Sequence, residues 1–525
     1  MATSALVATT ALRLVHEYVH ASDLAVAAAL LFTCSALANR ARASSRGAPM
    51  LWPVLGMIPT LFANLDDVYE WGAASLARSP GGTFPFRGMW LGGMSGVVTA
   101  SPRNVEHVLG TRFSNYPKGP YYRDRFAELL GDGIFNADGD AWRAQRRAAA
   151  LEMHSARFLA FSDGAVRRLV HGCLVPLLAR VTEKEGAVVD LQDVLLRFTF
   201  DNICAAAFGV DVGCLADGLP EVPFARAFER ATELTLARFV VPPFVWKAQR
   251  RLGVGGEREL ASAARAVREF ADRTVAERRA ELRKLGSLDD RSDLLSRLIA
   301  SSSSYTDAFL RDFCVSFILA GRDTSSVALT WFFYLLASHP HVESRVLADI
   351  RAAPRGDVAE MDYLHAALTE SRRLYPPVPV DFKEALADDV LPDGSAIRAG
   401  ERVIYFTYAM GRDAVTWGPD RLEFRPERWM RGGRFAGGGE SPFKYVVFNA
   451  GPRLCVGKRF AYMQMKTVAA AVLARFRVEV VPGQEVKPKL NTTLYMKHGL
   501  MVRFTARRDQ PQVAEIRRVI KVDEN

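Results

Sequence analysis

The stretch from residue 306 to residue 338 constrains the fold of this chain more than any other segment. It lacks proline throughout, and it contains two long apolar runs, Phe313 to Ala320 and Val327 to Ala337. Ser304, followed three residues later by Asp307, predicts an N-terminal capping box, and His339-Pro340 predicts the end of the helix. The pattern therefore predicts one helix about 50 Å long, at 1.5 Å per residue.

A transmembrane span is the alternative reading of this helix. Arg322 and Asp323 would then lie near the middle of the membrane, where charged side chains are costly and rare. A buried central helix of a large domain fits the sequence better. Gly321 in its middle is less favourable than alanine by about 1 kcal/mol, which indicates that another group approaches the backbone there.

The remaining pattern is mainly helical, with short strands near both ends. Strand patterns occupy 83–101, 382–411, 476–480 and 500–504, and a helix is expected from the 455 region to about residue 476. Hydrophobic residues make up 49% and charged residues 24% of the chain, which excludes a disordered protein. We predict a mainly α fold with minor β structure, in one large helical domain with small β-sheets.

The formal net charge of +10 is spread along the chain, so nucleic acid is not predicted as a partner. An anionic membrane surface or an acidic protein partner remains open. Six cysteines without a C-x-x-C pair fit a reducing compartment, and Cys455 stands in a special local context.

An uncharged run from Leu24 to Ala38 precedes Arg40, Arg42 and Arg46. A spanning helix needs about 20 residues, so this run of 15 must be extended to cross a membrane. A cleaved signal peptide and a plastid-type transit peptide are the alternatives. We predict a single uncleaved membrane-anchor helix with its basic flank in residues 1–47, and a catalytic domain in residues 48–525 that faces the cytosol by the positive-inside rule. Pro49, Pro53 and Pro59 predict a stiff connector between the two.

The segment from Phe448 to Gly457 is a glycine-rich loop that leads into a helix. Backbone N–H groups at a helix N-terminus favour a thiolate over a thiol at Cys455. Gly451 and Gly457 let the backbone lie close against a flat ligand. A buried, inert cysteine in a turn is the alternative for this loop taken alone.

The loop matches the haem-binding motif F-x-x-G-x-R-x-C-x-G of the cytochrome P-450 monooxygenases at every fixed position. Four further segments resemble motifs of the same family, in the family's order: Trp142 and Arg146 (W-x-x-x-R), Ala320 to Thr324 (the oxygen-groove motif), Glu370 to Arg373 (E-x-x-R), and Pro426 to Trp429 (P-E-R-F, with Trp where Phe is commoner). Together with the anchor and the proline connector, the resemblance extends over nearly the whole chain.

The resemblance implies haem b as the cofactor, held by Cys455, Arg453, Trp142, Arg146, Lys383, Phe448 and Gly451. Cys455 is the expected axial thiolate ligand of the haem iron, where it donates electron density that favours O–O cleavage. Arg453 is expected to bind a haem propionate through paired, charge-assisted hydrogen bonds. Lys383 is a weaker candidate for the propionates, and a solvated lysine on a strand is its alternative.

The resemblance also assigns proton transfer to Asp323 and Thr324, with Thr324 bonding the distal oxygen or a water and Asp323 relaying protons inward. A back-bond from Thr324 to its own helix is the alternative. Glu370 and Arg373 are spaced to pair on one helical face, and the resemblance adds Arg428 to form a buried structural network.

Within the family the chain resembles plant fatty-acid ω-hydroxylases, particularly those that act on long and very long chains for suberin and cutin. The likeness lies in residues 448–455, Val380 to Ala385 and Ala320 to Pro340. Hydroxylating a terminal methyl requires a narrow apolar channel. The candidate substrate residues are Tyr121, Tyr122, Phe126, Phe317, Val380, Phe382 and Leu494, each of which could equally be core. The segment 115–138 is expected to be a mobile loop.

The implied partners are a long-chain fatty acid, O2, membrane lipid, a flavoprotein reductase that draws on NADPH, and cytochrome b5. A basic face is expected to dock the reductase, formed by Arg143, Arg147, Lys444, Lys458, Arg459 and Lys466. The implied location is the endoplasmic reticulum membrane, with a single pass.

Three other functions remain open. The chain could oxidise another hydrophobic substrate, such as an alkane, a terpenoid or a sterol. It could be a fatty-acid hydroperoxide lyase or synthase, although those typically lack the threonine at the position of Thr324. It could also be a membrane-tethered haem-binding or lipid-binding protein without catalysis. The polar residues 507–525 are expected to form a loose tail.

Overall fold

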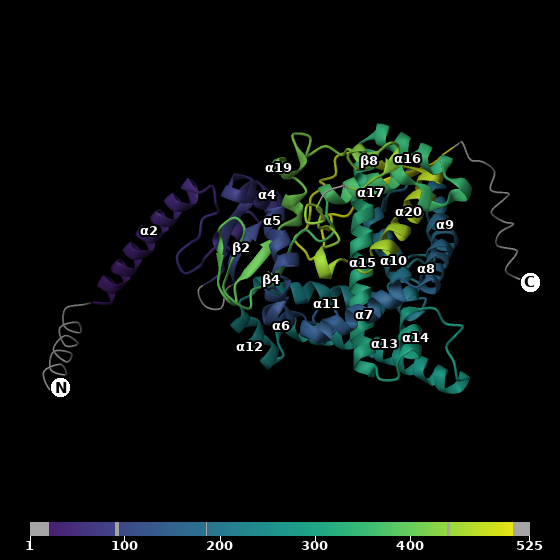
Figure 1. Cartoon of the computed structure of the whole chain (residues 1–525), viewed down its shortest axis with the longest axis horizontal. Coiled ribbons are helices and arrows are strands. Elements are labelled where there is room, and N and C mark those ends of the chain that lie inside the picture. The colour runs from purple at the N-terminus through teal and green to yellow at the C-terminus, as the bar shows by residue number, and fades with distance from the viewer. Residues whose placement is uncertain (1–19, 90–93, 185, 438–440, 508–525) are drawn as a thin grey trace, which may run out of the picture.

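The predicted long helix is present as α15 (Asp307–Ala337) and runs through the centre of the body (Figure 1). The computed structural model describes residues 20–89, 94–184, 186–437 and 441–507. The predicted capping box at Ser304 is wrong, because the N-cap is Thr306, whose hydroxyl accepts a hydrogen bond from the Phe309 N–H at 3.2 Å. The predicted stop is confirmed, since the next helix begins at Pro340.

Helix α10 (Leu191–Phe208) packs along α15 and explains the glycine in its middle. A Cβ atom at Gly321 would lie 2.6 Å from the Ile203 side chain of α10. The predicted close approach is therefore confirmed, and the approaching group is an isoleucine. The helix continues through Gly321 without interruption.

The other helices of the body are α3 (Ile58–Ala63), α4 (Val68–Arg78), α5 (Pro102–Glu106), α6 (Gly119–Leu130), α7 (Gly139–Met153), α8 (Ala156–Leu169), α9 (Val175–Thr182), α11 (Pro223–Val240), α12 (Pro243–Leu252), α13 (Gly255–Leu285), α14 (Leu294–Ser301), α16 (Pro340–Ala352), α17 (Asp362–Leu374), α18 (Thr407–Met410), α19 (Ala414–Trp417) and α20 (Lys458–Arg475). Helices α17 and α20 also pack against α15. The mainly helical fold class is confirmed.

The strands form small sheets at the edges of the helical body. The largest has the order β1 (Thr83–Arg87), β2 (Ser95–Thr99), β7 (Arg402–Tyr405) and β4 (Asp381–Glu384). A second sheet has the order β10 (Phe476–Val480), β11 (Met501–Ala506) and β3 (Val189–Asp190). Two further pairs are β5 (Asp389–Val390) with β6 (Ala396–Ile397), and β8 (Met430–Arg431) with β9 (Arg434–Phe435).

Half of the segment 115–138, which was expected to be a mobile loop, is the helix α6. Pro120 stands in its first turn, where a missing backbone N–H costs nothing, so the proline starts the helix. The carboxylate of Asp138 accepts hydrogen bonds from the N–H groups of Lys118 and Gly119, both at 3.0 Å. Glycine and proline thus mark the start of an ordered helix, contrary to the expectation.

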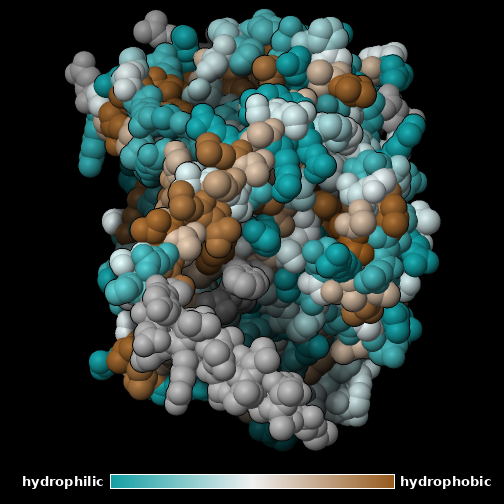
Figure 2. Space-filling model, turned by 90° about the vertical axis from the view of Figure 1, so that its left-hand side faces the viewer, coloured by the Kyte–Doolittle hydropathy of each residue, from teal (hydrophilic) through white to brown (hydrophobic). Residues whose placement is uncertain are grey.

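Helix α2 (Ala21–Ser45) projects from the body as a separate rod (Figure 1). Its segment Ser22–Ser45 is apolar and long enough to cross a membrane, and its hydrophobic window is not buried by the rest of the protein. Hydrophobic side chains gather on the face from which α2 projects (Figure 2). Besides those of α2, Val54, Leu55 and Phe62 in the connector are exposed. Helix α2 is a candidate membrane anchor, and the tail predicted for 507–525 lies almost entirely outside the described residues.

The buried carboxylate of Glu370 joins α17 to the segment that follows α18. It pairs with Arg373 through two bonds of 2.8 Å, and it lies 3.3 Å from the Nε of Arg428. The indole N–H of Trp429 donates to it at 2.8 Å. The expected contacts among Glu370, Arg373 and Arg428 are present, and both partners of the central pair have side chains without exposed surface.

We expect Glu370→Gln to destabilise the fold strongly. The change leaves the buried Arg373 without its counter-charge, which typically costs about 3–5 kcal/mol of unfolding free energy. Urea denaturation followed by tryptophan fluorescence would measure this loss. Glu485→Gln, at an exposed ion pair with Lys487, is the matched control and should leave the urea midpoint unchanged. A midpoint for Glu370→Gln equal to that of the control would contradict the structural role.

Candidate active site

The loop that carries Cys455 is held by backbone contacts that require its glycine. The Cys455 N–H donates to the carbonyl of Phe448 at 2.8 Å, which closes the loop. Gly451 has a φ of 59°, and a Cβ atom at this position would collide with the carbonyl of Leu109. Asn449 also adopts the left-handed region, with a φ of 62°. The expected close packing at Gly451 is therefore against the protein's own backbone.

The Cys455 thiol is accessible at the protein surface, although the groups around it exclude much of the bulk water. Burial raises the pKa of this thiol, while the Gly457 N–H and the charges of Arg146 and Lys458 act in the opposite direction. These donors and cations favour the thiolate once a metal replaces the proton. The local chemistry suits a thiolate ligand.

A cluster of cations lies beside this loop. Arg453 donates to Asp138 at 2.7 Å, and its guanidinium lies 4.5 Å from the ring of Trp142. Its Nε is buried without a hydrogen-bond partner among the described residues. Arg146 acts electrostatically on both Arg453 and Cys455. The structure thus brings together Arg453, Trp142, Arg146 and Cys455, as the sequence predicts.

Lys383 is fully buried, but its ammonium already has three partners. Its Nζ donates to Asp381 at 2.7 Å, to the Phe382 carbonyl at 3.0 Å and to the Tyr405 hydroxyl at 3.0 Å. An ammonium has three N–H groups, so this arrangement leaves none for another ligand. The alternative, a solvated lysine on a strand, is wrong because none of the Lys383 surface is exposed.

Lys118, which the sequence reasoning missed, lies near Arg453. We call Arg453, Arg146 and Lys118 the cation cluster. Burial, together with the charges of Lys383 and Arg453, lowers its pKa to about 7, although Asp381 and Asp138 act in the opposite direction. Among the described residues, no group accepts a hydrogen bond from its Nζ, which lies 4.1 Å from the ring centre of Tyr122. A buried cation with unused donors is suited to bind an anionic group. In the sequence, the only indication of such a role is that Lys118 directly precedes Gly119-Pro120.

These features fit a haem. An accessible thiol suits the iron, and the orphaned Arg453 Nε and the unused Lys118 donors suit the two propionates.

On α15, Thr324 and Asp323 differ in their surroundings. The Thr324 hydroxyl donates to the Ala320 carbonyl at 2.6 Å, which is the back-bond named as its alternative. Its oxygen lone pairs remain available to accept a hydrogen bond.

Asp323 is buried in a charge network that the sequence did not reveal. Arg322 approaches it at 3.1 Å and reaches Glu229 of α11 at 3.5 Å, and the Glu229 side chain is 54% exposed. Burial and then the charge of Asp323 raise the pKa of Tyr495 well above its usual value, so the phenol stays protonated and donates toward Asp323. The network connects the buried carboxylate to the surface at Glu229.

The aromatic residues predicted to contact substrate meet around α6 and β4. The ring of Tyr122 lies 4.6 Å from that of Phe126 and 5.8 Å from that of Phe382. Phe239 of α11, which the sequence reasoning did not single out, lies 5.7 Å from Phe126 and 6.0 Å from Tyr121. We call these five residues the aromatic cluster. It adjoins the cation cluster through the contact of Tyr122 with Lys118.

The other three substrate candidates lie outside the aromatic cluster. Phe317 stacks on Phe313 along α15 at 4.8 Å. Val380 is partly buried against the main core. Leu494 is fully buried, and its carbonyl accepts the indole N–H of Trp331 at 2.6 Å.

The predicted basic face is wrong in one member. Lys466 is buried, with 4% of its surface exposed, because it lies on the inward side of α20. Arg147, Lys458 and Arg459 are exposed, and Arg143 pairs with Asp140 at 2.5 Å. A groove of about 370 Å³ lies beside them, lined by residues that include Lys444, Leu454 and Lys458.

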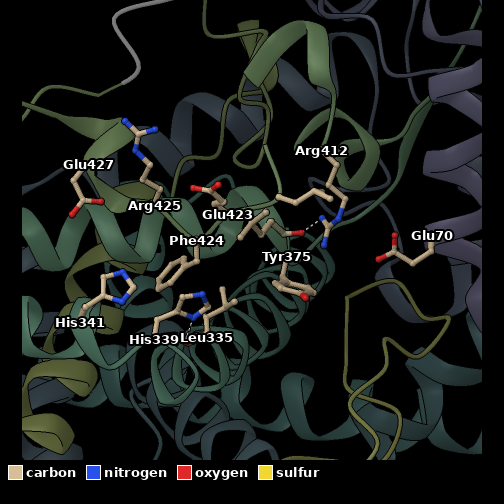
Figure 3. Close-up of a pocket in the computed structure, with 12 residues that line it drawn as sticks. Glu70, Leu335, His339, His341, Tyr375, Arg412, Glu423, Phe424, Arg425 and Glu427 are labelled. Atoms are coloured by element: carbon tan, nitrogen blue, oxygen red, sulfur yellow. Dashed lines mark hydrogen bonds between the residues drawn. The ribbon is translucent and has the colours of Figure 1, made fainter. Parts of the chain in front are cut away.

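A larger cleft of about 830 Å³ lies elsewhere, between the ends of α15 and α17 and the segment 422–427 (Figure 3). His339, Tyr375 and Phe424 line it, with Arg412 and Glu70 at its rim. None of the predicted site residues borders this cleft. Arg453, Trp142, Arg146 and Lys118 lie around the Cys455 loop, which is therefore the candidate active site.

We expect Lys118→Met to weaken haem retention in a pH-dependent way. Anionic propionates raise the pKa of Lys118 from about 7, so its contribution to haem binding is present near neutral pH and decreases as the pH rises toward 10. At pH 7 the variant should transfer haem to apomyoglobin about tenfold faster than the unmodified protein, because a charge-assisted bond contributes about 1.5–3 kcal/mol. At pH 9.5 the two rates should converge.

Absorbance at the haem band would follow the transfer. Lys184→Met, at an exposed position, is the control and should behave like the unmodified protein at both pH values. Equal pH dependence in Lys118→Met and the unmodified protein would rule out this role.

Comparison with known proteins identifies the family. The family model described as Cytochrome P450 matches residues 50–504. Cytochrome P450 86B1 of Arabidopsis thaliana is 49% identical over 486 residues, covering 88% of this chain and 86% of the relative. Cytochrome P450 94A2 of Vicia sativa is 42% identical, covering 87% and 91%. Noroxomaritidine synthase 1 of Narcissus pseudonarcissus is 35% identical, covering 93% and 97%. The chain therefore belongs to the cytochrome P450 family of haem-thiolate monooxygenases.

Proposed function

We propose that this chain hydroxylates the terminal carbon of long or very long chain fatty acids, in the synthesis of suberin-type or cutin-type polymers. As a member of its family it uses haem iron, O2 and electrons from a reductase. The overall reaction consumes the fatty acid, O2, NADPH and a proton, and it yields the ω-hydroxy acid, water and NADP⁺. NADPH acts indirectly, through the flavoprotein reductase.

The observation that carries the proposal is the aromatic cluster beside the cation cluster. Its rings pack with centroid distances from 4.6 to 6.4 Å, so an alkyl chain that enters between α6, α11 and β4 would lie against apolar rings. A narrow channel admits an extended alkyl chain and holds its inner methylenes away from the reacting centre. The resemblance of residues 380–385 and 448–455 to plant ω-hydroxylases supports the same substrate class.

When bound, the haem iron supplies the activation of O2 and the insertion of one oxygen atom into the C–H bond. We assign Cys455 as its thiolate ligand, with Arg453, Trp142, Arg146 and Lys118 beside its propionates. Lys383 would act on the propionates only indirectly, because it holds Asp381 next to Lys118.

Proton supply is assigned to Asp323 and Thr324. Tyr495 and Arg322 orient the Asp323 carboxylate, and Glu229 offers an exposed entry for protons. The Thr324 hydroxyl would hold a water by accepting and donating hydrogen bonds. Breaking its back-bond to Ala320 frees its proton for this purpose.

The electron donor is proposed to dock on the exposed basic residues Arg147, Lys458 and Arg459, near the groove beside the Cys455 loop. An acidic flavoprotein reductase fits this charge, and cytochrome b5 fits it as a second donor. We further propose the endoplasmic reticulum membrane as the location, with α2 as the single-pass anchor and the body in the cytosol, since Arg40, Arg42 and Arg46 follow its apolar segment.

Turnover in sealed microsomal vesicles, with reductase and NADPH added outside, would test the substrate and the orientation together. We expect terminal alcohols from saturated acids, with rates that rise toward the longer chains, identified by mass spectrometry of the product. An alkane, a terpenoid and a sterol serve as competing substrates. In-chain products, or oxidation of only the competing substrates, would overturn the substrate class. Turnover only after the vesicles are opened would overturn the orientation.

We expect Thr324→Ala to uncouple electron use from product formation. Loss of the positioned hydroxyl should lower the product formed per NADPH by about tenfold and raise hydrogen peroxide, because a positioned proton donor contributes on the order of 10²-fold or more. Product yield, peroxide and NADPH consumption would be measured together.

Thr330→Ala is the matched control for this variant. Thr330 lies on the same helix and makes the same kind of back-bond, to the Ser326 carbonyl at 2.8 Å. Its replacement should leave the coupling ratio unchanged, and Thr324→Ser should restore it. Unchanged coupling in Thr324→Ala would count against the proton role.

A further inference from the structure

Arg125 is a buried cation that forms no ion pair with any of the described residues. It lies on α6, with 2% of its surface exposed. Its Nε donates to the Arg238 carbonyl at 3.0 Å, and its Nη1 donates to the Tyr121 carbonyl at 3.0 Å. Among the described residues, its Nη2 has no hydrogen-bond partner. A buried guanidinium normally faces a carboxylate, so the missing partner needs an explanation.

The carboxylates around Arg125 are already engaged by other cations. Glu257 pairs with Arg238 at 2.5 Å, Glu384 pairs with Arg402 at 2.9 Å, Asp124 pairs with Lys247 at 2.8 Å, and Glu128 pairs with Arg238 and with Arg250. Burial lowers the pKa of Arg125 to about 10, so the group stays charged at neutral pH. One positive charge therefore remains uncompensated in the described part of this region.

A second buried donor without a partner lies next to it. The indole N–H of Trp246, on α12, has no acceptor among the described residues, and its side chain is 1% exposed. The Arg125 guanidinium lies 5.9 Å from the centre of the Trp246 ring. Leaving two neighbouring donors unsatisfied costs about 1–3 kcal/mol for each group, and a single anion with two oxygens would satisfy both.

These two donors border the aromatic cluster. The guanidinium of Arg125 lies 3.3 Å from the ring centre of Tyr121 and 5.3 Å from that of Phe239. Both rings belong to the aromatic cluster, to which the proposed function assigns the alkyl chain. A ligand with an apolar chain and one carboxylate matches this juxtaposition.

We propose that Arg125 and Trp246 bind the carboxylate of the fatty-acid substrate, with one carboxylate oxygen on the Arg125 Nη2 and the other on the Trp246 indole N–H. The assignment rests on the proposed function and adds the device that recognises the acid group. Fixing the carboxylate between α6 and α12 also fixes how far the chain reaches, so the same pair sets which carbon is presented for hydroxylation.

Binding of hexadecanoic acid and its methyl ester to the holoenzyme, measured by calorimetry, would test the assignment. The unmodified protein should bind the acid about tenfold to a hundredfold more tightly than the ester, the range that a charge-assisted hydrogen bond of about 1.5–3 kcal/mol provides. Arg125→Gln should bring the acid-to-ester ratio close to one, mainly by weakening the acid. Trp246→Phe keeps the ring and removes the N–H, and it should lower the ratio several-fold.

Arg123→Gln, on the same helix but half exposed, is the matched control and should keep the ratio of the unmodified protein. An unchanged ratio in Arg125→Gln or in Trp246→Phe would overturn the assignment, as would a ratio near one in the unmodified protein. If Arg125→Gln does not fold, Trp246→Phe alone decides.

Product analysis separates this inference from the proposed function. Arg125→Gln should spread hydroxylation from the terminal carbon to its neighbours. Terminal hydroxylation of acid and ester alike by both proteins would overturn the carboxylate site and leave the ω-hydroxylase intact. Failure of the unmodified protein to bind or oxidise any fatty acid would overturn the proposed function itself.

Discussion

The buried carboxylate of Glu370 organises the side of the molecule that holds the cysteine loop. It accepts bonds from Arg373, from the backbone of Arg425 and from Trp429, so that α17 and the segment around residue 425 are held by one charge. The ring of Trp429 in turn packs on Tyr445, whose hydroxyl donates to α17 at 3.1 Å. The position of the Cys455 loop, which begins at Phe448, therefore depends on the Glu370 carboxylate, to which we assign a structural role only. A charge buried at such expense is stable only while all its donors remain in place.

Helix α15 carries the second group of candidate residues. Its contact with α10 at Gly321 fixes the two helices at a separation that any larger residue would enlarge, since Ile203 fills the space. The same turn of helix carries Asp323 and Thr324, so the packing contact lies next to the two residues to which we assign proton supply. Arg322 extends this arrangement to α11 through Glu229, and Tyr495 reaches it from the segment between β10 and β11. Elements that are distant in sequence thus converge on one carboxylate.

The features that could be predicted from the sequence are those encoded in local spacing. The length of α15, the Glu370 network and the Cys455 loop each depend on residues a few positions apart or on a family motif. The sequence reasoning failed where a residue's structure or exposure depends on contacts with residues distant in the sequence. Helix α6 was expected to be a loop because glycine and proline are common in turns. Here they begin a helix, since the distant Asp138 accepts the N–H of Gly119. Lys466 was expected to be exposed, but the sequence does not show which face of α20 packs inward. The roles of Lys118, Phe239 and Trp246 can be inferred only when their neighbours in the fold are known.

Asp138 has a consequence for how such enzymes diverge. One carboxylate accepts the N–H groups that begin α6 and also the guanidinium of Arg453. Helix α6, which carries part of the aromatic cluster, and the loop that carries Arg453 and Cys455 are therefore joined through one side chain. A chimaera that imports α6 from a relative must import a compatible residue 138 as well, or the exchange will disturb the cofactor loop. An exchange of α6 in this architecture therefore changes the aromatic cluster and the support of Arg453 together.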